Sequence, residues 1–260
     1  MNLFSPPRVG RRAWKVWMRN RDVFMKTYQT NFIPPIVEPI LYLFALGFGL
    51  GIFIQEIDGM PYVQFIAPAL LAIATMNTSF FECTYGSYIR MYYQKTFDAI
   101  IATPVSLEEV IAGELLWGST KSTIHAGIML VIIMAFGLVK VPMALLVLPF
   151  SFLAGFLFST IAMCFTAITV NIDSLNYPIY LFITPMFLFS GTFFPFSALP
   201  VQMQYFAKVL LPLVHVVTVT RGFATGQFDL GIILSLLWIL AVSAILYVLS
   251  VNLMKKRLII

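Results

Sequence analysis

The sequence predicts an all-α integral membrane protein with six transmembrane helices. Apolar residues make up 60% of the 260-residue chain and charged residues only 10%, whereas soluble domains have about half and about a quarter. The apolar residues gather in runs of about 20 or more, the length that crosses a hydrocarbon core about 30 Å thick. Lys and Arg stand mostly near the two chain ends, as membrane topology signals do. The net charge of +5 is therefore not taken as a sign of nucleic-acid binding.

Residues 9–30 are predicted to form an interfacial helix. On a helical wheel, apolar and basic side chains fall on opposite sides. Such a helix suits the anionic cytoplasmic leaflet of a membrane, and the alternative is a disordered basic tail. The apolar side consists of Val9, Ala13, Val16, Trp17, Phe24 and Tyr28.

Five apolar runs have the length of a span without interruption, and a sixth contains Pro178 and Pro185. Those prolines are tolerable because neighbouring helices can satisfy the freed backbone carbonyls. The expected spans are residues 32–54, 62–84, 107–136, 144–170, 174–193 and 231–254.

Six spans place both chain ends on one side of the membrane, and the basic residues indicate which side. With the termini inside, twelve Lys and Arg residues lie inside, Lys121 lies within a span, and only Lys140, Lys208 and Arg221 lie outside. This arrangement satisfies the positive-inside rule. We therefore expect cytoplasmic N and C termini.

Residues 196–226 are expected to enter the outer leaflet and return without crossing it. A span here would carry the basic C-terminal end outside, against the charge bias, with Pro212 in its middle. Between Pro200 and Pro212 there is room for about 11 helical residues, or about 17 Å, which is too short to cross. We predict a re-entrant helical hairpin that forms an outer gate, in which His215 and Arg221 contact an emerging headgroup. The candidate gate residues are Ser190, Gly191, Phe194, Pro195, His215 and Arg221.

The connection between the second and third spans predicts a short helix within residues 93–104. Thr103 ends it, because a residue before proline avoids helical dihedral angles. Ser106, with Glu109 three residues later, is a capping-box pattern that begins the next long helix. The short helix would therefore lie crosswise between two long helices.

This short helix is expected to present an apolar group to the cytosol, formed by Phe97, Ile100 and Ile101, beside the acidic Asp98. A plain surface turn is the alternative. An exposed apolar group instead indicates a docking surface for another protein.

The run KTFDAIIATPVS, residues 95–106, resembles the intracellular loop of the ABC type-2 exporter permeases, with Asp98 where that family usually has Glu. Further stretches support the resemblance in order along the chain. They look most like the branch of nodulation lipo-chitooligosaccharide, drug and polysaccharide export permeases. These stretches are VEPILYLFALGFGLG, GELLWGSTK, SGTFFPFSALP and PLVHVVTVTRG.

The resemblance implies that the short helix is a coupling helix that inserts into a groove of a separate ABC ATPase subunit. ATP and Mg would bind to that partner, and this chain would bind no cofactor. Two copies of each subunit would move an amphiphilic or lipid-linked substrate outward across a bacterial plasma (inner) membrane. The implied coupling residues are Lys95, Thr96, Phe97, Asp98, Ile100, Ile101, Thr103 and Pro104.

Ionisable residues in or near the spans are functional candidates by default, because a charge inside a membrane is expensive. On the third span, Glu114, Lys121 and His125 form one helical stripe. The stripe could be a proton relay or a headgroup contact, or its charged residues could be interfacial anchors paired with neighbouring spans. On the first span, Glu38 is expected to accept hydrogen bonds from the interfacial helix or the third span. Two alternatives to an ATP-driven exporter stay open. One is a proton-coupled carrier that uses the stripe, and the other is a lipid-modifying enzyme that uses His125 or His215.

Overall fold

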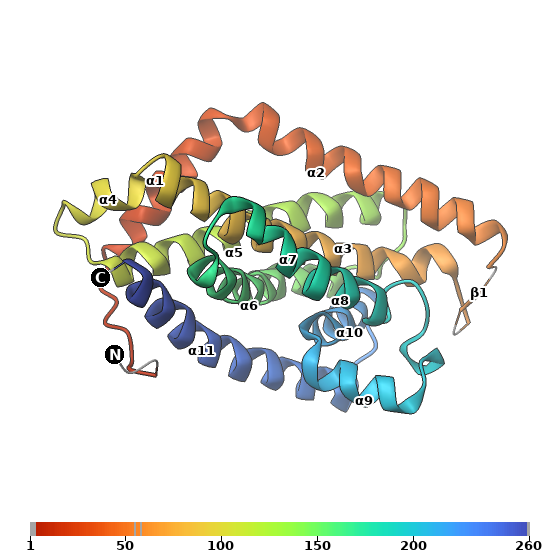
Figure 1. Ribbon diagram of the computed structural model, residues 1–260. Coiled ribbons are helices and arrows are strands. Elements are labelled where there is room, and N and C mark those ends of the chain that lie inside the picture. Colours follow the sequence, from red (N-terminus) through yellow and green to blue (C-terminus); the bar gives the residue numbers. More distant parts are fainter. Residues whose placement is uncertain (1–3, 55, 58, 259–260) are drawn as a thin grey trace.

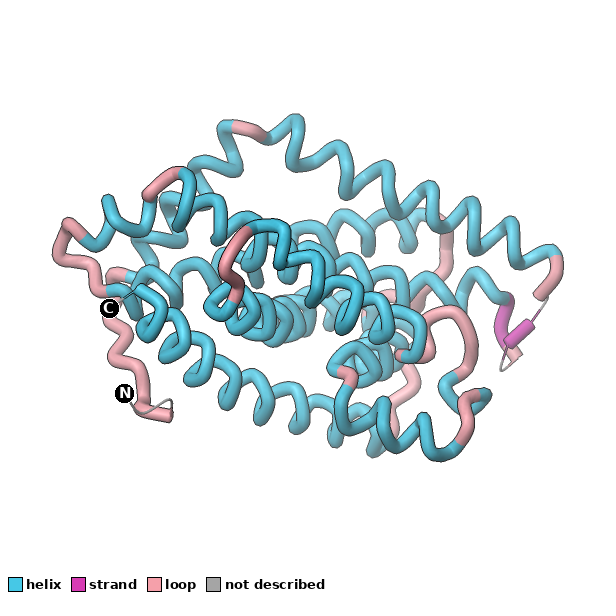
Figure 2. Tube along the Cα trace, in the orientation of Figure 1, coloured by secondary structure: helices cyan, strands magenta, loops and turns pink. Residues whose placement is uncertain are grey.

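The computed structural model describes residues 4–54, 56–57 and 59–258 as a bundle of helices. In that part of the chain, five helices are long and apolar enough to cross a membrane, and a bent pair of helices could count as a sixth. The strands described are only the two-residue β1 (Glu56–Ile57) and β2 (Met60–Pro61), a small antiparallel pair (Figure 2). The prediction of an all-α integral membrane protein is confirmed.

The long helices follow the apolar runs of the sequence. Several continue from α-helix into π or 3-10 turns, so that one span comprises several labelled pieces. The candidate spans are Asn31–Ile52, Tyr62–Tyr93, Leu107–Ala135, Met143–Ile168 and Leu230–Leu258. The elements that form them are α2 (Tyr28–Tyr42) with η1 (Leu43–Gly49) and η2 (Leu50–Ile52); α3 (Tyr62–Phe81) with η3 (Glu82–Gly86) and η4 (Ile89–Tyr93); α5 (Leu107–Ala135); η5 (Met143–Leu146) with α6 (Val147–Ile168); and α11 (Leu230–Leu258).

The two ends of the bundle differ. The N and C termini and α4 (Thr96–Ile101) lie at one end, here called the terminal end (Figure 1). The strand pair and α9 (Val201–Leu210) lie at the opposite end, here called the far end.

The segment with two prolines is helical but short. It consists of η6 (Ile172–Leu175), α7 (Asn176–Pro178), η7 (Ile179–Ile183) and α8 (Thr184–Phe189). From α7 to α8 it would extend about 21 Å at 1.5 Å per residue, less than the thickness of a hydrocarbon core. A crossing by residues 174–193 stays a prediction.

At the far end, α9 and α10 (Pro212–Thr225) are bent by 93° relative to each other. Pro212 is the first residue of α10, where its missing N–H costs no hydrogen bond. Gly226 then ends α10 with a φ of 72°, a left-handed conformation that glycine adopts without strain. The break at Pro212 thus follows from the sequence, while the depth of this pair in a membrane stays a prediction.

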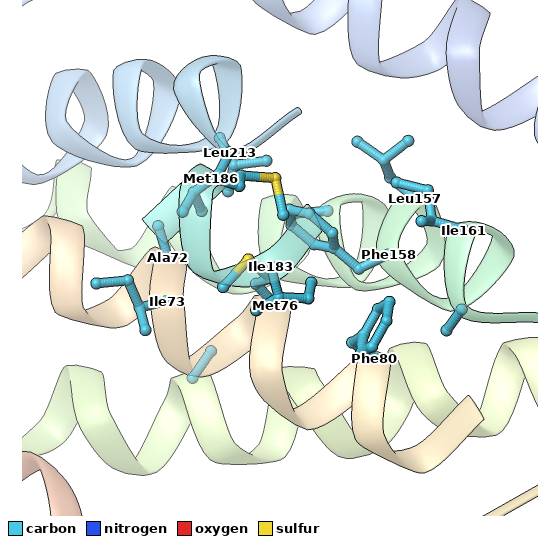
Figure 3. Packing of buried hydrophobic residues seen from close by; sticks show 14 of the residues in the cluster. Ala72, Ile73, Met76, Phe80, Leu157, Phe158, Ile161, Ile183, Met186 and Leu213 are labelled. Atoms are coloured by element: carbon cyan, nitrogen blue, oxygen red, sulfur yellow. The ribbon is translucent and has the colours of Figure 1, made fainter. Parts of the chain in front are cut away.

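The core lies around α3, most of which is buried, whereas α2 and α11 expose most of their surface. In Figure 3, side chains of α3 face α6, the η7–α8 segment and α10. Because apolar side chains gain little by leaving lipid, close packing of this kind is what holds membrane helices together. The labelled residues are Ala72, Ile73, Met76, Phe80, Leu157, Phe158, Ile161, Ile183, Met186 and Leu213.

Candidate functional site

A cavity of about 370 Å³ lies between α2, α3 and α5, with Phe187 of α8 in its wall. Its size is within the range of small-molecule sites. Polar groups from all three spans face it, together with aromatic rings. The polar residues are Glu38, Asn77, Thr78, Glu82, Lys121 and His125, and the aromatic ones are Tyr42, Phe81 and Phe187.

A buried ion-pair network begins at this cavity with Glu82 and Lys121, which line it, and continues to Arg90 and Glu114, which do not. Lys121 Nζ lies 2.7 Å from Glu82 Oε2, and Arg90 Nη1 lies 2.8 Å from Glu82 Oε1. Arg90 also binds Glu114 Oε2 through Nη2 at 2.5 Å and Nε at 2.9 Å. Two cations and two carboxylates therefore alternate between the end of the second span and the third span. Such compensation is what makes charges tolerable at these positions.

The N-terminal helix α1 (Ala13–Lys26) joins this network. Asn20 Nδ2 donates to Glu114 Oε1 at 2.7 Å, and Trp17 Nε1 donates to Thr120 Oγ1 at 2.9 Å. The close approach of α1 to α5 depends on Gly113, where a Cβ would stand 2.6 Å from Val16 Cβ. The apolar side of the predicted interfacial helix therefore faces protein at α5.

The stripe Glu114–Lys121–His125 is present on α5, but its members have separate partners. His125 Nδ1 lies 2.9 Å from Thr78 Oγ1 on α3, whereas Glu114 and Lys121 bind different residues of the second span. This pairing supports the interpretation of Glu114 and Lys121 as anchors to neighbouring spans.

Glu38 differs from the other charged residues. Its side chain is exposed, and within residues 4–54, 56–57 and 59–258 it forms neither a hydrogen bond nor an ion pair. The expectation that Glu38 accepts hydrogen bonds from α1 or α5 is therefore wrong in this conformation. The physical reason is its position on the open side of α2, a helix that is mostly exposed.

At the terminal end, α4 is a short helix that follows Lys95, whose φ is 53°. The capping box that starts α5 is confirmed, because Ser106 and Glu109 each bind the backbone of the other. Phe97 is only 1% exposed and belongs to the core, so the expectation that it faces the cytosol is wrong. A short amphipathic helix turns its largest apolar side chain inward.

The remaining residues of the predicted coupling surface lie on or beside the outer side of α4. Thr96 and Ile100 are half-buried, whereas the others are exposed. Arg12 of the N-terminal region binds the carbonyl oxygen of Pro104. This surface contains Lys95, Thr96, Asp98, Ile100, Ile101, Thr103 and Pro104.

At the far end, Arg221 holds the predicted outer gate in place. Its Nη2 donates to the carbonyl oxygen of Gly191 at 3.0 Å, and its guanidinium lies 4.0 Å from the ring centroid of Phe65. Gly191 has a φ of 69°, so this turn favours glycine. Ser190 is buried, and Phe194 and Pro195 are half-buried nearby.

His215 is tied to its surroundings. Its Nε2 lies 2.8 Å from the carbonyl oxygen of Lys208, its Nδ1 lies 3.1 Å from Ser235 Oγ, and its ring stacks on Trp238. Both ring nitrogens therefore have protein partners in this arrangement. Contact of His215 with an emerging headgroup stays a prediction.

Sequence reasoning did not connect Arg90 with Glu82 or Asn20 with Glu114. In the charge count Arg90 is only one of the twelve inside Lys and Arg residues, and Asn20 is not among the residues of the apolar side of the helical wheel. A usable signal was the spacing of Glu82, Gly86 and Arg90 in steps of four, which puts the two charges on one side of a helix with a glycine between them.

Together these features define a multi-pass helical membrane protein with a polar cavity among its spans and a short exposed helix at the end that holds both termini. Among the residues that the structure describes, no group of three or more His, Cys, Asp or Glu side chains could hold a metal ion. The class that the fold defines is a multi-pass helical membrane protein.

The profile of the ABC-2 type transporter family matches residues 11–225, and the chain belongs to this family. Nodulation protein J of Sinorhizobium fredii is 32% identical over 243 residues, which cover 94% of this chain and 92% of that protein. Nodulation protein J of Rhizobium leguminosarum bv. viciae is 29% identical over 258 residues, or 99% of each chain. The inner membrane transport permease YadH of Escherichia coli is 24% identical over 220 residues, or 81% and 80%. No solved structure matches.

Proposed function

We propose that this chain is the permease subunit of an ATP-driven exporter that moves an amphiphilic or lipid-linked substrate outward. The observation that carries the proposal is the family match over residues 11–225, which include both the polar cavity and the exposed side of α4. Two permease copies and two ABC ATPase subunits would form the assembly, and ATP and Mg would bind to the ATPase. The protein would lie in the bacterial inner membrane with cytoplasmic termini.

The geometry of the terminal end supports docking of the ATPase there. Asp98 and Ile101 project from α4 on its exposed side, while Phe97 fixes the helix to the core. A helix anchored from beneath can transmit a push to the spans, because packed elements move as rigid bodies. Arg90 lies in η4, just before α4, and binds both Glu82 and Glu114.

The pairing of Lys121 and Glu114 with other protein charges favours the exporter over a proton-coupled carrier. A relay residue must gain and lose a proton during transport. Breaking a buried ion pair by neutralising one partner is strongly unfavourable, so these residues suit a structural role.

Proteoliposomes that contain this chain and its proposed ABC ATPase partner test the proposal. The probe is a fluorescent lipid-linked disaccharide, and its movement between leaflets is followed by chemical quenching. We expect movement only with ATP and Mg. Movement driven by a proton gradient without the ATPase would overturn the proposal.

The docking site is tested with Ile101→Asp, which should abolish the stimulation of ATP hydrolysis while the permease stays folded. Val170→Asp is the matched control, because Val170 is also exposed and apolar but lies outside α4. Equal loss of stimulation in both variants would contradict docking at α4.

A further inference from the structure

The charges around the cavity do not cancel. Lys121 is paired with Glu82 at 2.7 Å, and Arg90 compensates Glu82 and Glu114 together. Those four charges sum to zero. Among the carboxylates and cations that line the cavity itself, which are Glu38, Glu82 and Lys121, only Glu38 has no ion-pair partner in the described part of the chain. Arg19, which interacts electrostatically with Glu114, lines the adjoining cleft instead.

The other polar groups of the cavity add no positive charge. Asn77 and Thr78 are neutral, and Thr78 already pairs with His125. A ligand with a positive headgroup therefore complements this cavity, whereas an anionic headgroup would meet a carboxylate at its mouth and a lysine that is already neutralised.

Aromatic rings surround the same space. Tyr42 and Phe81 are about 40% exposed, and Phe187 completes the wall. The faces of such rings attract organic cations, including quaternary ammonium groups. The ring arrangement and the charge balance thus favour the same kind of headgroup.

An apolar path leads away from Glu38. The side chains of Pro34, Val37, Leu41 and Ala45 recur at helical spacing on α2 and form, with Glu38 and Tyr42, one open side of that helix. The cavity and this side of α2 share Glu38, so a headgroup at Glu38 could extend its chain along the apolar side of α2. This shape fits an amphiphile.

We propose that the cavity binds an amphiphile with a protonated or quaternary amine headgroup, and that Glu38 is its counter-ion. The ring faces of Tyr42 and Phe81 would contact the cation, and the apolar tail would lie along α2. The role of this cavity as the entry site for an exported substrate rests on the proposed function. Binding of the amphiphile to the cavity can be measured in the permease alone.

The test measures equilibrium binding to the full-length permease in lipid nanodiscs, without ATPase or ATP. The probes share one tail: labelled dodecyltrimethylammonium, dodecyl sulfate and dodecyl maltoside, all below their micelle-forming concentrations. We expect saturable binding of the ammonium probe, at least about tenfold tighter than binding of the sulfate probe.

Glu38→Gln should weaken binding of the ammonium probe about tenfold or more and leave the maltoside probe unaffected. Tyr42→Leu should weaken binding of the ammonium probe about two- to fivefold. Glu56→Gln is the matched control, because Glu56 is an exposed carboxylate on β1 at the far end and its change should have no effect.

Three results would overturn the inference: equal or tighter binding of dodecyl sulfate, unchanged binding in Glu38→Gln, or no saturable binding of the ammonium probe. The last is the result expected if a second copy of the chain fills the open side of α2. Loss of ATP-driven transport with amine binding intact would instead refute the proposed function alone.

Discussion

Replacing Arg90 by Met tests how much the buried ion pairs stabilise the permease. The Arg90 side chain is 14% exposed, and its partners Glu82 and Glu114 are 8% and 1% exposed. Without the guanidinium, Glu82 keeps Lys121 as its counter-ion. Glu114 keeps hydrogen bonds from Asn20 and Ser87 but loses its ion-pair partner. Removing one partner of a buried pair costs about 3–5 kcal/mol, and we expect a loss of that size in the free energy of unfolding.

The free energy of unfolding can be measured in bicelles by titration with sodium dodecyl sulfate, with tryptophan fluorescence as the signal. Arg21→Met is the matched control, because its pair with Asp22 is 45% and 56% exposed. Exposed pairs contribute at most about 1 kcal/mol. The loss of unfolding free energy in Arg90→Lys should lie between the losses in Arg90→Met and Arg21→Met, because Lys retains the charge but cannot bind two carboxylates in the manner of a guanidinium.

A double-mutant cycle separates the ion pair from other effects of removing the side chain. Glu114→Gln in the Arg90→Met background should restore part of the stability, because it removes the uncompensated buried charge. The reasoning is refuted if Arg90→Met unfolds within about 1 kcal/mol of the unmodified chain. It is also refuted if the losses of unfolding free energy caused by Arg90→Met and Glu114→Gln simply add in the double variant.

Three further predictions concern the packing of the two ends. Gly113→Leu should push Val16 and the N-terminal helix away from α5. Limited proteolysis should then cleave that helix faster, and unchanged cleavage would contradict the packing. Phe97→Ala should lower the free energy of unfolding by about 3–5 kcal/mol, the usual cost of removing a buried Phe. Ile101→Ala should lower it by less than about 1 kcal/mol, and equal losses in the two variants would show that both side chains are alike in burial. Arg221→Met should free the turn that its guanidinium holds and increase hydrogen exchange there, and unchanged exchange would show that the hydrogen bond is dispensable.

Much of the fold could be predicted because the membrane imposes strong rules on the sequence. Backbone groups in lipid must be satisfied within the helix, so each long apolar run becomes a helix. Local rules also held where a residue and its near neighbours in the chain decide the conformation. The break at Pro212, the left-handed Gly226 and the capping box of Ser106 and Glu109 all appear in the structure as their chemistry predicts.

The site was harder to predict because it depends on which helices are neighbours. The wheel of the N-terminal helix identifies an apolar side, but it cannot show that Asn20 belongs to that side and meets Glu114. The same difficulty explains Phe97. An apolar residue in a short polar connection can face a partner protein or its own core, and its burial at 1% depends on how α4 lies against the spans.

The ion pairs connect the two regions for which a function is proposed. Arg90 lies between the cavity and α4 along the chain, and it shares Glu82 with Lys121 of the cavity wall. Because α4 packs against both η4 and α5, a displacement of α4 would act on the two elements that hold Arg90 and Glu114. Arg90 and Lys121 share Glu82 as a carboxylate partner. A change in the Arg90–Glu82 pair therefore alters how far Glu82 compensates the positive charge of Lys121 at the cavity. The Arg90 variants thus also test this connection, because Arg90→Lys should change binding of an ammonium probe more than Arg21→Met does.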